Sequence, residues 1–242
     1  MNNLQSLFDL LLIDIETVPQ VADFDQLPDY GRKLFFDKIS KTVPENISLQ
    51  EVYDQKAGIL AEFGKVICIS TAFFYKDKGD RICLKIKSIS GHDETDLLNQ
   101  FIRLTNQFQN YKQKFFFAGH NIREFDIPFL CRRMVINKID LPPYLYIYGA
   151  KPWDIMMVDT MQWWKFGDHK NYTSLHLLAS ILDIPTSKDD IDGSMVQHVY
   201  YKENNLQRIV NYCEKDVVVV ARVIQRLINL PIIEEELIFK SY

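Results

Sequence analysis

The chain has 242 residues, of which 47% are apolar and 25% are charged. This mixture is typical of a globular protein with a full hydrophobic core, and it excludes disordered and fibrous classes. No uncharged apolar run approaches the length of about 18 residues that a membrane span needs, and the opening residues lack the basic region of a signal peptide. We therefore expect no signal peptide, no membrane span and no membrane partner.

The charge balance limits the kind of nucleic-acid contact that the chain can make. With 28 basic and 32 acidic residues, the net charge is −4, which argues against broad, non-specific coating of nucleic acid. A nucleic-acid enzyme stays compatible with this charge, because divalent cations bound by several carboxylates would offset it. The four cysteines show no close pairing, which argues against a zinc knuckle and a disulfide scaffold. The expected location is cytoplasmic.

The pattern of apolar residues predicts one mixed α/β domain over residues 1–242, with an insertion at about 18–62 between the first two strands. The order of strands and helices fits a sheet with an antiparallel part. In chain order we expect a strand buried on both faces at 7–16, helical patches at 30–40 and 48–62, a hairpin of strands at 65–75 and 81–90, a helix at 93–112, a strand at 114–121, a helix at 123–138, a short strand near 154–159, a helix at 173–183, a polar loop at 184–194 and a long helix at 204–229.

Two acids lie at the end of the first predicted strand. Side chains alternate along a strand, so Asp14 and Glu16 point to the same face, at the carboxyl end where α/β sheets place ligands. Adjacent carboxylates repel one another unless a cation lies between them. Taken alone, the pair is equally compatible with a strand end that reaches solvent.

Further acids lie at the starts or borders of predicted helices. Tyr212 and Asp216 are four residues apart on one face of the last helix, beside its buried stripe. Asp126 begins a helix, where an acid is favoured by unpaired backbone amides. Each of these has an ordinary structural explanation, but all can converge with Asp14 at one end of the sheet.

The ordered set of motifs resembles a known superfamily. Asp14-Ile15-Glu16-Thr17, Asn121 to Phe125-Asp126, and Tyr212 to Asp216 are similar to the D-x-E, N-x3-F-D and Y-x3-D motifs of DEDD exonucleases in the tyrosine-bearing (DEDDy) branch. The chain looks most similar to the 3′→5′ proofreading exonuclease domain of family B DNA polymerases, and to stand-alone bacterial proteins like that domain. The resemblance implies an RNase H-like fold: a mixed sheet of about five strands, the first three antiparallel and the rest parallel, flanked by helices.

The same resemblance implies the activity and the residues that perform it. Asp14, Glu16, Asp126 and Asp216 would bind two Mg²⁺ or Mn²⁺ ions, which suit a cage of hard oxygen ligands. Tyr212 would orient the attacking water. Thr17, Asn121 and Phe125 would help to bind the terminal nucleotide, although Phe125 also fits a core position. The expected function is metal-dependent 3′→5′ hydrolysis of single-stranded or frayed DNA by a two-metal-ion mechanism.

Two alternatives stay open at this point. The same site could act on RNA, since the sequence shows no decisive contact to a 2′ hydroxyl, or the fold could be an inert module that binds single strands. The length leaves no room for a polymerase beside this domain, so proofreading or repair would require a partner polymerase or repair protein in trans. We also expect that Trp163, Trp164 and Tyr172 are mostly buried, and that Arg132 and Arg133 lie on a solvated helix face.

Overall fold

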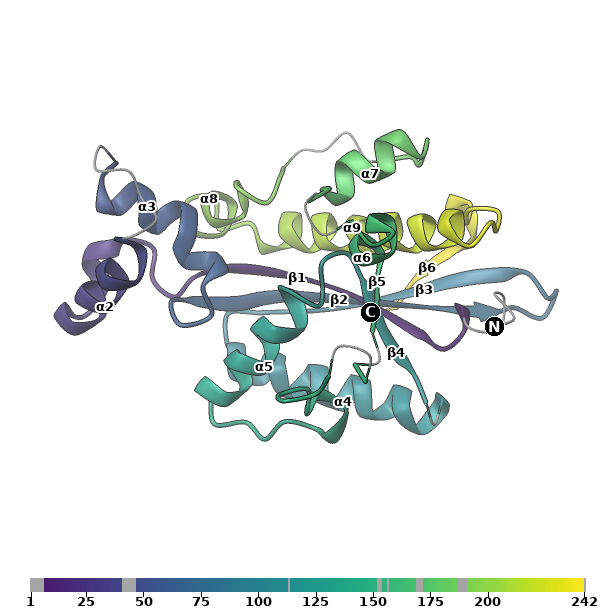
Figure 1. Cartoon of the computed structure of the whole chain (residues 1–242), viewed down its shortest axis with the longest axis horizontal. Coiled ribbons are helices and arrows are strands. Elements are labelled where there is room, and N and C mark those ends of the chain that lie inside the picture. The colour runs from purple at the N-terminus through teal and green to yellow at the C-terminus, as the bar shows by residue number, and fades with distance from the viewer. Residues whose placement is uncertain are drawn as a thin grey trace.

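The computed structural model describes residues 7–40, 47–112, 114–151, 154–155, 157–168, 172–186 and 191–241. These residues form a sheet with helices on both faces (Figure 1). The six strands of the sheet are arranged in the order β5-β4-β1-β2-β3-β6. Their bounds are Leu10–Pro19 (β1), Gly64–Lys76 (β2), Ile82–Ser90 (β3), Phe116–Gly119 (β4), Met157–Asp159 (β5) and Ile238–Lys240 (β6).

The strand directions confirm the predicted mixed sheet. β1 pairs with β2 and β2 with β3 in antiparallel fashion, whereas β4 is parallel to β1 and β5 is parallel to β4. The short β6 adds a sixth strand, parallel to β3, at the other edge. The sequence pattern predicts no strand after the long helix, and the three residues of β6 carry little periodicity of their own.

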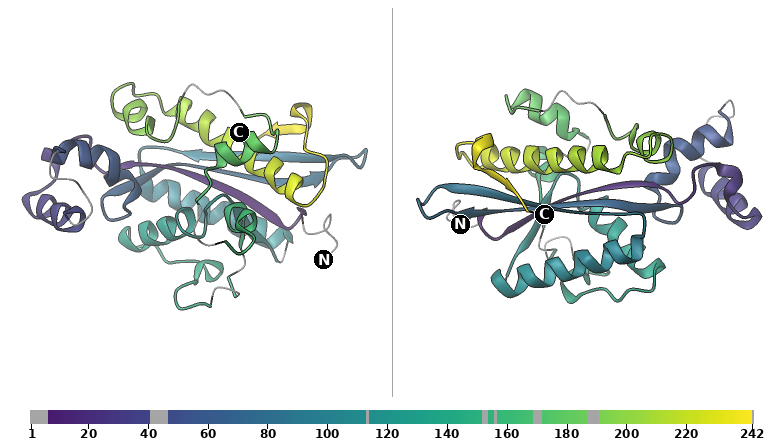
Figure 2. Two further views of the ribbon diagram at one scale, coloured as in Figure 1. Left: turned by 45° about the horizontal axis from the view of Figure 1, so that its top comes forward. Right: turned by 180° about the vertical axis from the view of Figure 1, so that it is seen from behind.

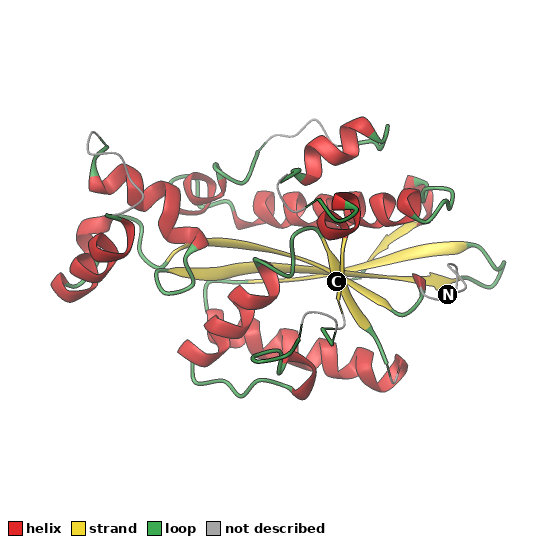
Figure 3. Ribbon diagram, in the orientation of Figure 1, coloured by secondary structure: helices red, strands yellow, loops and turns green. Residues whose placement is uncertain are grey.

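Helices cover the two faces unequally, as the views in Figure 2 and the colouring in Figure 3 show. The long α9 lies on one face, together with α6, α7 and α8, and α4 and α5 cover the other. The bounds are Glu94–Lys112 (α4), Asp126–Ile136 (α5), Thr160–Lys165 (α6), Leu175–Ile181 (α7), Val196–Tyr201 (α8) and Leu206–Leu227 (α9). The short helices α6 and α8 were absent from the sequence prediction. None of the helices in the described ranges is both long and apolar enough to cross a membrane.

The alternation of side chains along β1 decides which face receives the acids. Leu10 and Leu12 pack with α9 residues such as Val217, while Leu11 and Ile13 pack on the opposite side with residues of α4 and α5. A strand repeats every two residues, so Asp14 and Glu16 follow Leu12 onto the α9 face.

The predicted insertion forms a small helical unit at one end of the sheet (Figure 1). It contains α2 (Asp29–Ile39), α3 (Leu49–Lys56) and the 3₁₀ turns Phe24–Gln26 (η1) and Ala57–Ile59 (η2), which confirms both predicted helical patches. The unit has its own core of packed aromatic rings, Phe24, Phe35, Tyr53 and Phe63. Residues 41–46 of the insertion, 156 of the strand predicted near 154–159, and 187–190 of the polar loop lie outside the described residues.

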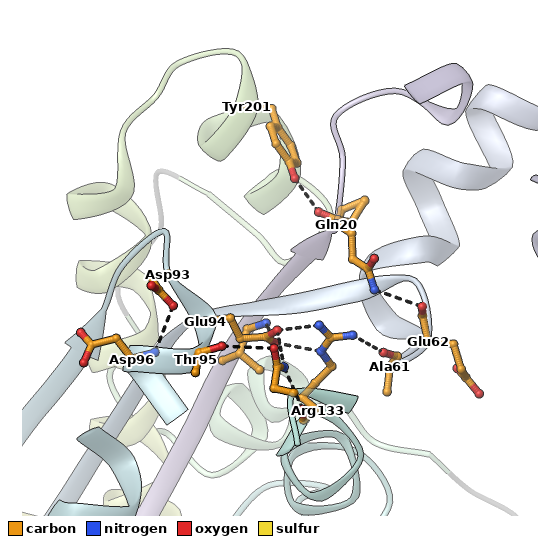
Figure 4. A network of polar contacts seen from close by, with 12 residues as sticks. Gln20, Ala61, Glu62, Asp93, Glu94, Thr95, Asp96, Arg133 and Tyr201 are labelled. Carbon is orange, nitrogen blue, oxygen red and sulfur yellow. Dashed lines mark hydrogen bonds and ion pairs between the residues drawn. The ribbon is translucent and has the colours of Figure 1, made fainter. Parts of the chain in front are cut away.

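A buried ion pair joins α4 and α5, which cover one face of the sheet, to each other and to the sheet (Figure 4). Arg133 of α5 donates from Nε to Glu94 Oε1 at 2.9 Å and from Nη1 to the Ala61 carbonyl at 2.8 Å. Glu94 also accepts from Val66 N at 2.8 Å and from Asn137 Nδ2 at 2.9 Å. The expectation of a solvated Arg133 is therefore wrong: its side chain is buried and fully engaged within the protein.

Candidate active site

The carboxyl end of β1 carries the first two predicted site residues. The pairing of β1 with β2 shifts register between Glu16 and Thr17, an irregularity of the kind that re-aims side chains near sites. Oxygen atoms of Asp14 and Glu16 and the Cys213 sulfur all lie within 4.8 Å of one another. Two carboxylates thus share a confined space on the α9 face, as the alternation along the strand predicts.

Asp126 reaches this end of β1 from the opposite side. The pairing of β4 with β1 ends at Leu12, so the β1 edge beyond that residue has no strand partner on this side among the described residues. There the Ile15 backbone N–H donates to Asp126 Oδ1 at 3.2 Å. Ile15 lies between Asp14 and Glu16, so this bond holds Asp126 beside both acids of β1, although Asp126 is 111 residues away from Ile15 in the sequence.

A tight turn after β4 delivers Asp126 to this position. A Cβ at Gly119 would lie 2.2 Å from Ile122 Cγ2 and 2.8 Å from the Ile13 carbonyl oxygen, so only glycine fits. Asn121 follows with φ of 62°, a left-handed conformation that asparagine tolerates. Asp159 then fixes the turn by accepting from the N–H groups of Asn121 at 2.9 Å and Arg123 at 3.1 Å.

Helix α9 contributes Asp216, Tyr212 and Cys213. The neighbouring Asp216 carboxylate is the largest electrostatic influence on Asp14, and it also accepts a hydrogen bond from Tyr212. Cys213 donates from Sγ to Asp14 Oδ2 at 3.2 Å and to the Asp14 carbonyl oxygen at 3.4 Å. The last helix is thereby tied directly to the acid of the first strand.

The acids perturb one another's protonation. Burial, then the charges of Asp216 and Asp126, raise the pKa of Asp14 well above its ordinary value. Burial, then Asp14 and Asp216, do the same to the pKa of Glu16. Burial raises the pKa of Asp126 to about 7, despite hydrogen bonds from backbone amides that lower it. Such crowding of buried carboxylates is costly without a cation and is typical of functional sites.

Tyr212 is perturbed in the same sense. Burial, followed by the charges of Asp216, Glu16 and Asp14, raises the pKa of Tyr212 far above that of a free phenol. In the metal-free protein its hydroxyl therefore keeps its proton at neutral pH, so Tyr212 can donate a hydrogen bond.

Two of the three predicted substrate-binding residues line a pocket beside the acids, and the third lies in the turn that leads to Asp126. Thr17 and Phe125 line a pocket together with Glu16. Phe125 also packs on Phe129, at a ring distance of 5.5 Å, so it combines a wall position with a core contact. Asn121 Oδ1 is buried and accepts no hydrogen bond from the residues that the structure describes.

Other sequence expectations near the site have mixed outcomes. His120, in the turn before Asn121, contacts the Thr160 hydroxyl at 2.9 Å and the Thr173 carbonyl at 2.8 Å, so both of its ring nitrogens have partners within the protein. The expectation that Trp163 and Tyr172 are mostly buried is wrong: their exposed fractions are 39% and 69%. Sequence reasoning missed the thiol of Cys213, whose apolar position on the helix gave no signal of a polar contact.

One comparison with known proteins identifies a family. A family described as "Predicted 3'-5' exonuclease related to the exonuclease domain of PolB" matches residues 59–227, well over half of the sequence. The chain belongs to this family. The matched range includes Asp126, Tyr212 and Asp216 but begins after Asp14 and Glu16, so the link to β1 depends on the structure.

The remaining comparisons are more distant. The chain is similar to the family B DNA polymerase from the hyperthermophilic archaeon Pyrobaculum calidifontis, with 13% sequence identity and a TM-score of 0.48. That match covers 90% of this chain but only 27% of the polymerase chain. No curated protein matches the sequence significantly.

Proposed function

We propose that the chain is a metal-dependent 3′→5′ exonuclease that hydrolyses the terminal phosphodiester bond of single-stranded or frayed DNA. Family membership supplies the reaction class. The observation that carries the proposal is the convergence of Asp14, Glu16, Asp126 and Asp216 from three separate chain segments. Burial raises the pKa values of the first three, and the charges of neighbouring site acids raise those of Asp14 and Glu16 further.

The donor set fits two divalent cations. All four acids offer hard oxygen ligands of the kind that Mg²⁺ and Mn²⁺ prefer, and cations would offset the repulsion that raises the pKa of Asp14 and Glu16. Asp14, Glu16, Asp126 and Asp216 would hold them. When bound, two such ions acidify a water molecule and neutralise the charge that develops on the leaving oxygen.

The other residues of the chain position the reactants. Tyr212 keeps its proton and lies one helical turn from Asp216, so its hydroxyl would orient the attacking water. Cys213 would hold the Asp14 carboxylate in one orientation through its thiol hydrogen bond. Thr17, Phe125 and the free acceptor of Asn121 would bind the terminal nucleotide.

The test is digestion of 5′-labelled single-stranded DNA and RNA of equal sequence by purified protein, with Mg²⁺ or Mn²⁺ and then with a chelator. We expect stepwise shortening of the DNA from its 3′ end, lost in chelator and in Asp14→Asn but kept in Asp140→Asn, which changes an exposed acid. Faster shortening of the RNA would identify an exoribonuclease with the same site. Shortening that survives chelation would refute the metal mechanism, and binding without shortening of either polymer would favour an inert binding module.

A further inference from the structure

A pocket of about 770 Å³ opens at the carboxyl end of β1, and the insertion forms one of its walls. Glu16, Thr17 and Phe125 line the side next to the candidate active site. The insertion contributes residues of α3 and η2, including Lys56 and Ile59, and the segment around α8 contributes the facing wall. The pocket is therefore continuous with the position of the acids.

The two walls are tied to one another and to the strand. Gln197 of α8 donates from Nε2 to Asp54 Oδ1 of α3 at 2.8 Å, which joins the two walls, and Gln50 of α3 donates to the same oxygen at 2.8 Å. The Tyr201 hydroxyl donates to the Pro19 carbonyl at the end of β1, next to Gln20 in Figure 4. These bonds hold the pocket in a preformed shape.

η2 also rests directly on the strand. A Cβ at Gly58 would lie 3.4 Å from Pro19 Cδ and 3.5 Å from the Thr17 carbonyl oxygen, ordinary van der Waals distances that show how closely the segment follows β1. Lys56 lies two residues before Gly58 and Ile59 directly follows it, and both line the same pocket as Thr17.

Among the described basic residues that line the pocket, Lys56 is the one whose charge is available to a ligand. Within the described ranges it forms no ion pair, whereas Lys202 lies 3.9 Å from Asp23 and His198 lies 3.7 Å from Glu203. A strand of phosphates that approaches the four acids needs such a cation, because acids and phosphates repel one another.

The rest of the lining suits the other parts of a nucleotide. Ile59 is 53% exposed and Phe125 is half-buried, and both offer apolar surface to a base. Gln197 Oε1 is buried and accepts no hydrogen bond from the described residues, so it can accept from a sugar hydroxyl or a base amino group. The volume of about 770 Å³ is within the range of about 300 to 1,000 Å³ for small-ligand pockets, a size that suits unpaired nucleotides.

We propose that the insertion makes this pocket a binding site for the unpaired nucleotides that lead to the scissile bond, with Lys56 contacting a backbone phosphate. The inference rests on the proposed function and assigns a role to a segment that sequence motifs leave unexplained. It makes the insertion a determinant of selectivity for single-stranded over double-stranded ends.

The test measures binding separately from cleavage. A 5′-fluorescein single-stranded DNA oligonucleotide is titrated with wild type, Lys56→Ala and Lys56→Arg in chelator, by fluorescence anisotropy over a series of salt concentrations. Lys78→Ala is the matched control, because Lys78 is exposed in the β2–β3 turn, at the opposite end of the sheet from Pro19. Cleavage in Mg²⁺ is measured in parallel, and a blunt duplex of the same sequence is the competitor.

We expect Lys56→Ala to weaken binding about two- to fivefold and to reduce the salt slope by about 0.7, the value of one single-strand phosphate contact. Lys56→Arg should restore both, Lys78→Ala should match wild type, and the duplex should bind at least tenfold more weakly. An unchanged affinity and salt slope in Lys56→Ala, with wild type active, would overturn the pocket assignment alone. Equal binding of duplex and single strand would overturn the selectivity. The Lys56 effect in a protein that cleaves nothing would support strand binding here and refute the exonuclease.

Discussion

Removal of the Asp126 charge should change how stability depends on pH in the metal-free protein. Asp126 is 5% exposed, and burial raises its pKa from 3.8 to about 7. The folded state therefore keeps a proton that the unfolded state loses, between about pH 4 and pH 7. Since stability falls with pH wherever the folded state binds more protons, the ionisation of Asp126 destabilises the fold as pH rises through this window.

The magnitude follows from the same shift. A difference of about three pKa units, at 1.36 kcal/mol each, amounts to about 4 kcal/mol as an upper value. The corresponding slope is about −1.4 kcal/mol per pH unit. Asp126→Asn removes this ionisation, but an asparagine Oδ1 can still accept the Ile15 N–H that lies 3.2 Å away.

The assay is urea denaturation of both proteins in chelator at several pH values from 4 to 8. The free energy of unfolding should decrease from pH 4 to pH 8 in wild type. We expect this decrease to be smaller in Asp126→Asn, by up to about 4 kcal/mol. The comparison between pH values cancels any constant cost of the buried amide. Addition of Mg²⁺ at pH 8 should stabilise wild type more than the variant, since ligands stabilise the state that binds them.

Asp77→Asn is a suitable control, because hydrogen bonds from Arg81 lower the pKa of Asp77 and its effect has the opposite sign. The stabilisation that the Asp77 carboxylate contributes is present above the ordinary pKa of an aspartate and is lost as the pH falls below that pKa. Parallel profiles of Asp126→Asn and wild type from pH 4 to 8 would refute the inference that buried acids at this site stay protonated without metal.

Three further substitutions test separate parts of the structure. Tyr212→Phe should lower kcat by roughly 100-fold with little change in the Mn²⁺ concentration for half-maximal activity, and equal loss of both would contradict a water-orienting role. Glu94→Gln should lower the free energy of unfolding by about 3 to 5 kcal/mol in urea denaturation, because it leaves the buried Arg133 charge unpaired, and a loss below about 1 kcal/mol would show that this pair is effectively solvated. Gly119→Ala should cost about 1 to 3 kcal/mol in the same assay, because its Cβ would overlap Ile122, and an unchanged midpoint would show that the turn can rearrange.

The parts of the fold that follow from local periodicity could be predicted. Successive side chains of a strand point to opposite faces, so the sequence alone places Asp14 and Glu16 on one face of β1. The long apolar stripe of α9 identifies the helix that covers it. α8 and β6, of six and three residues, were not predicted, because neither gives a periodic signal that separates it from the surrounding loops.

The candidate site, like the fold, has parts that the sequence predicts and parts that it does not. Its motif residues are recognisable as a set, but the contacts that hold them are tertiary. Asp159 organises the Asn121 turn across 38 residues, and the Cys213 thiol meets Asp14 across 199. Neither spacing follows a repeat, and a buried thiol in an apolar stripe resembles any other core residue. The burial of Arg133 likewise depends on Glu94, which sequence periodicity places only as the first residue of another helix.

The most direct test of the account is the position of bound Mn²⁺ in crystals of the protein, measured by anomalous diffraction. The account predicts two Mn²⁺ peaks at the carboxyl end of β1, within coordination distance of Asp14 and shared among Glu16, Asp126 and Asp216. Crystals equilibrated with Mn²⁺ at millimolar concentration that show no peak at these carboxylates, or peaks only elsewhere on the surface, would contradict it.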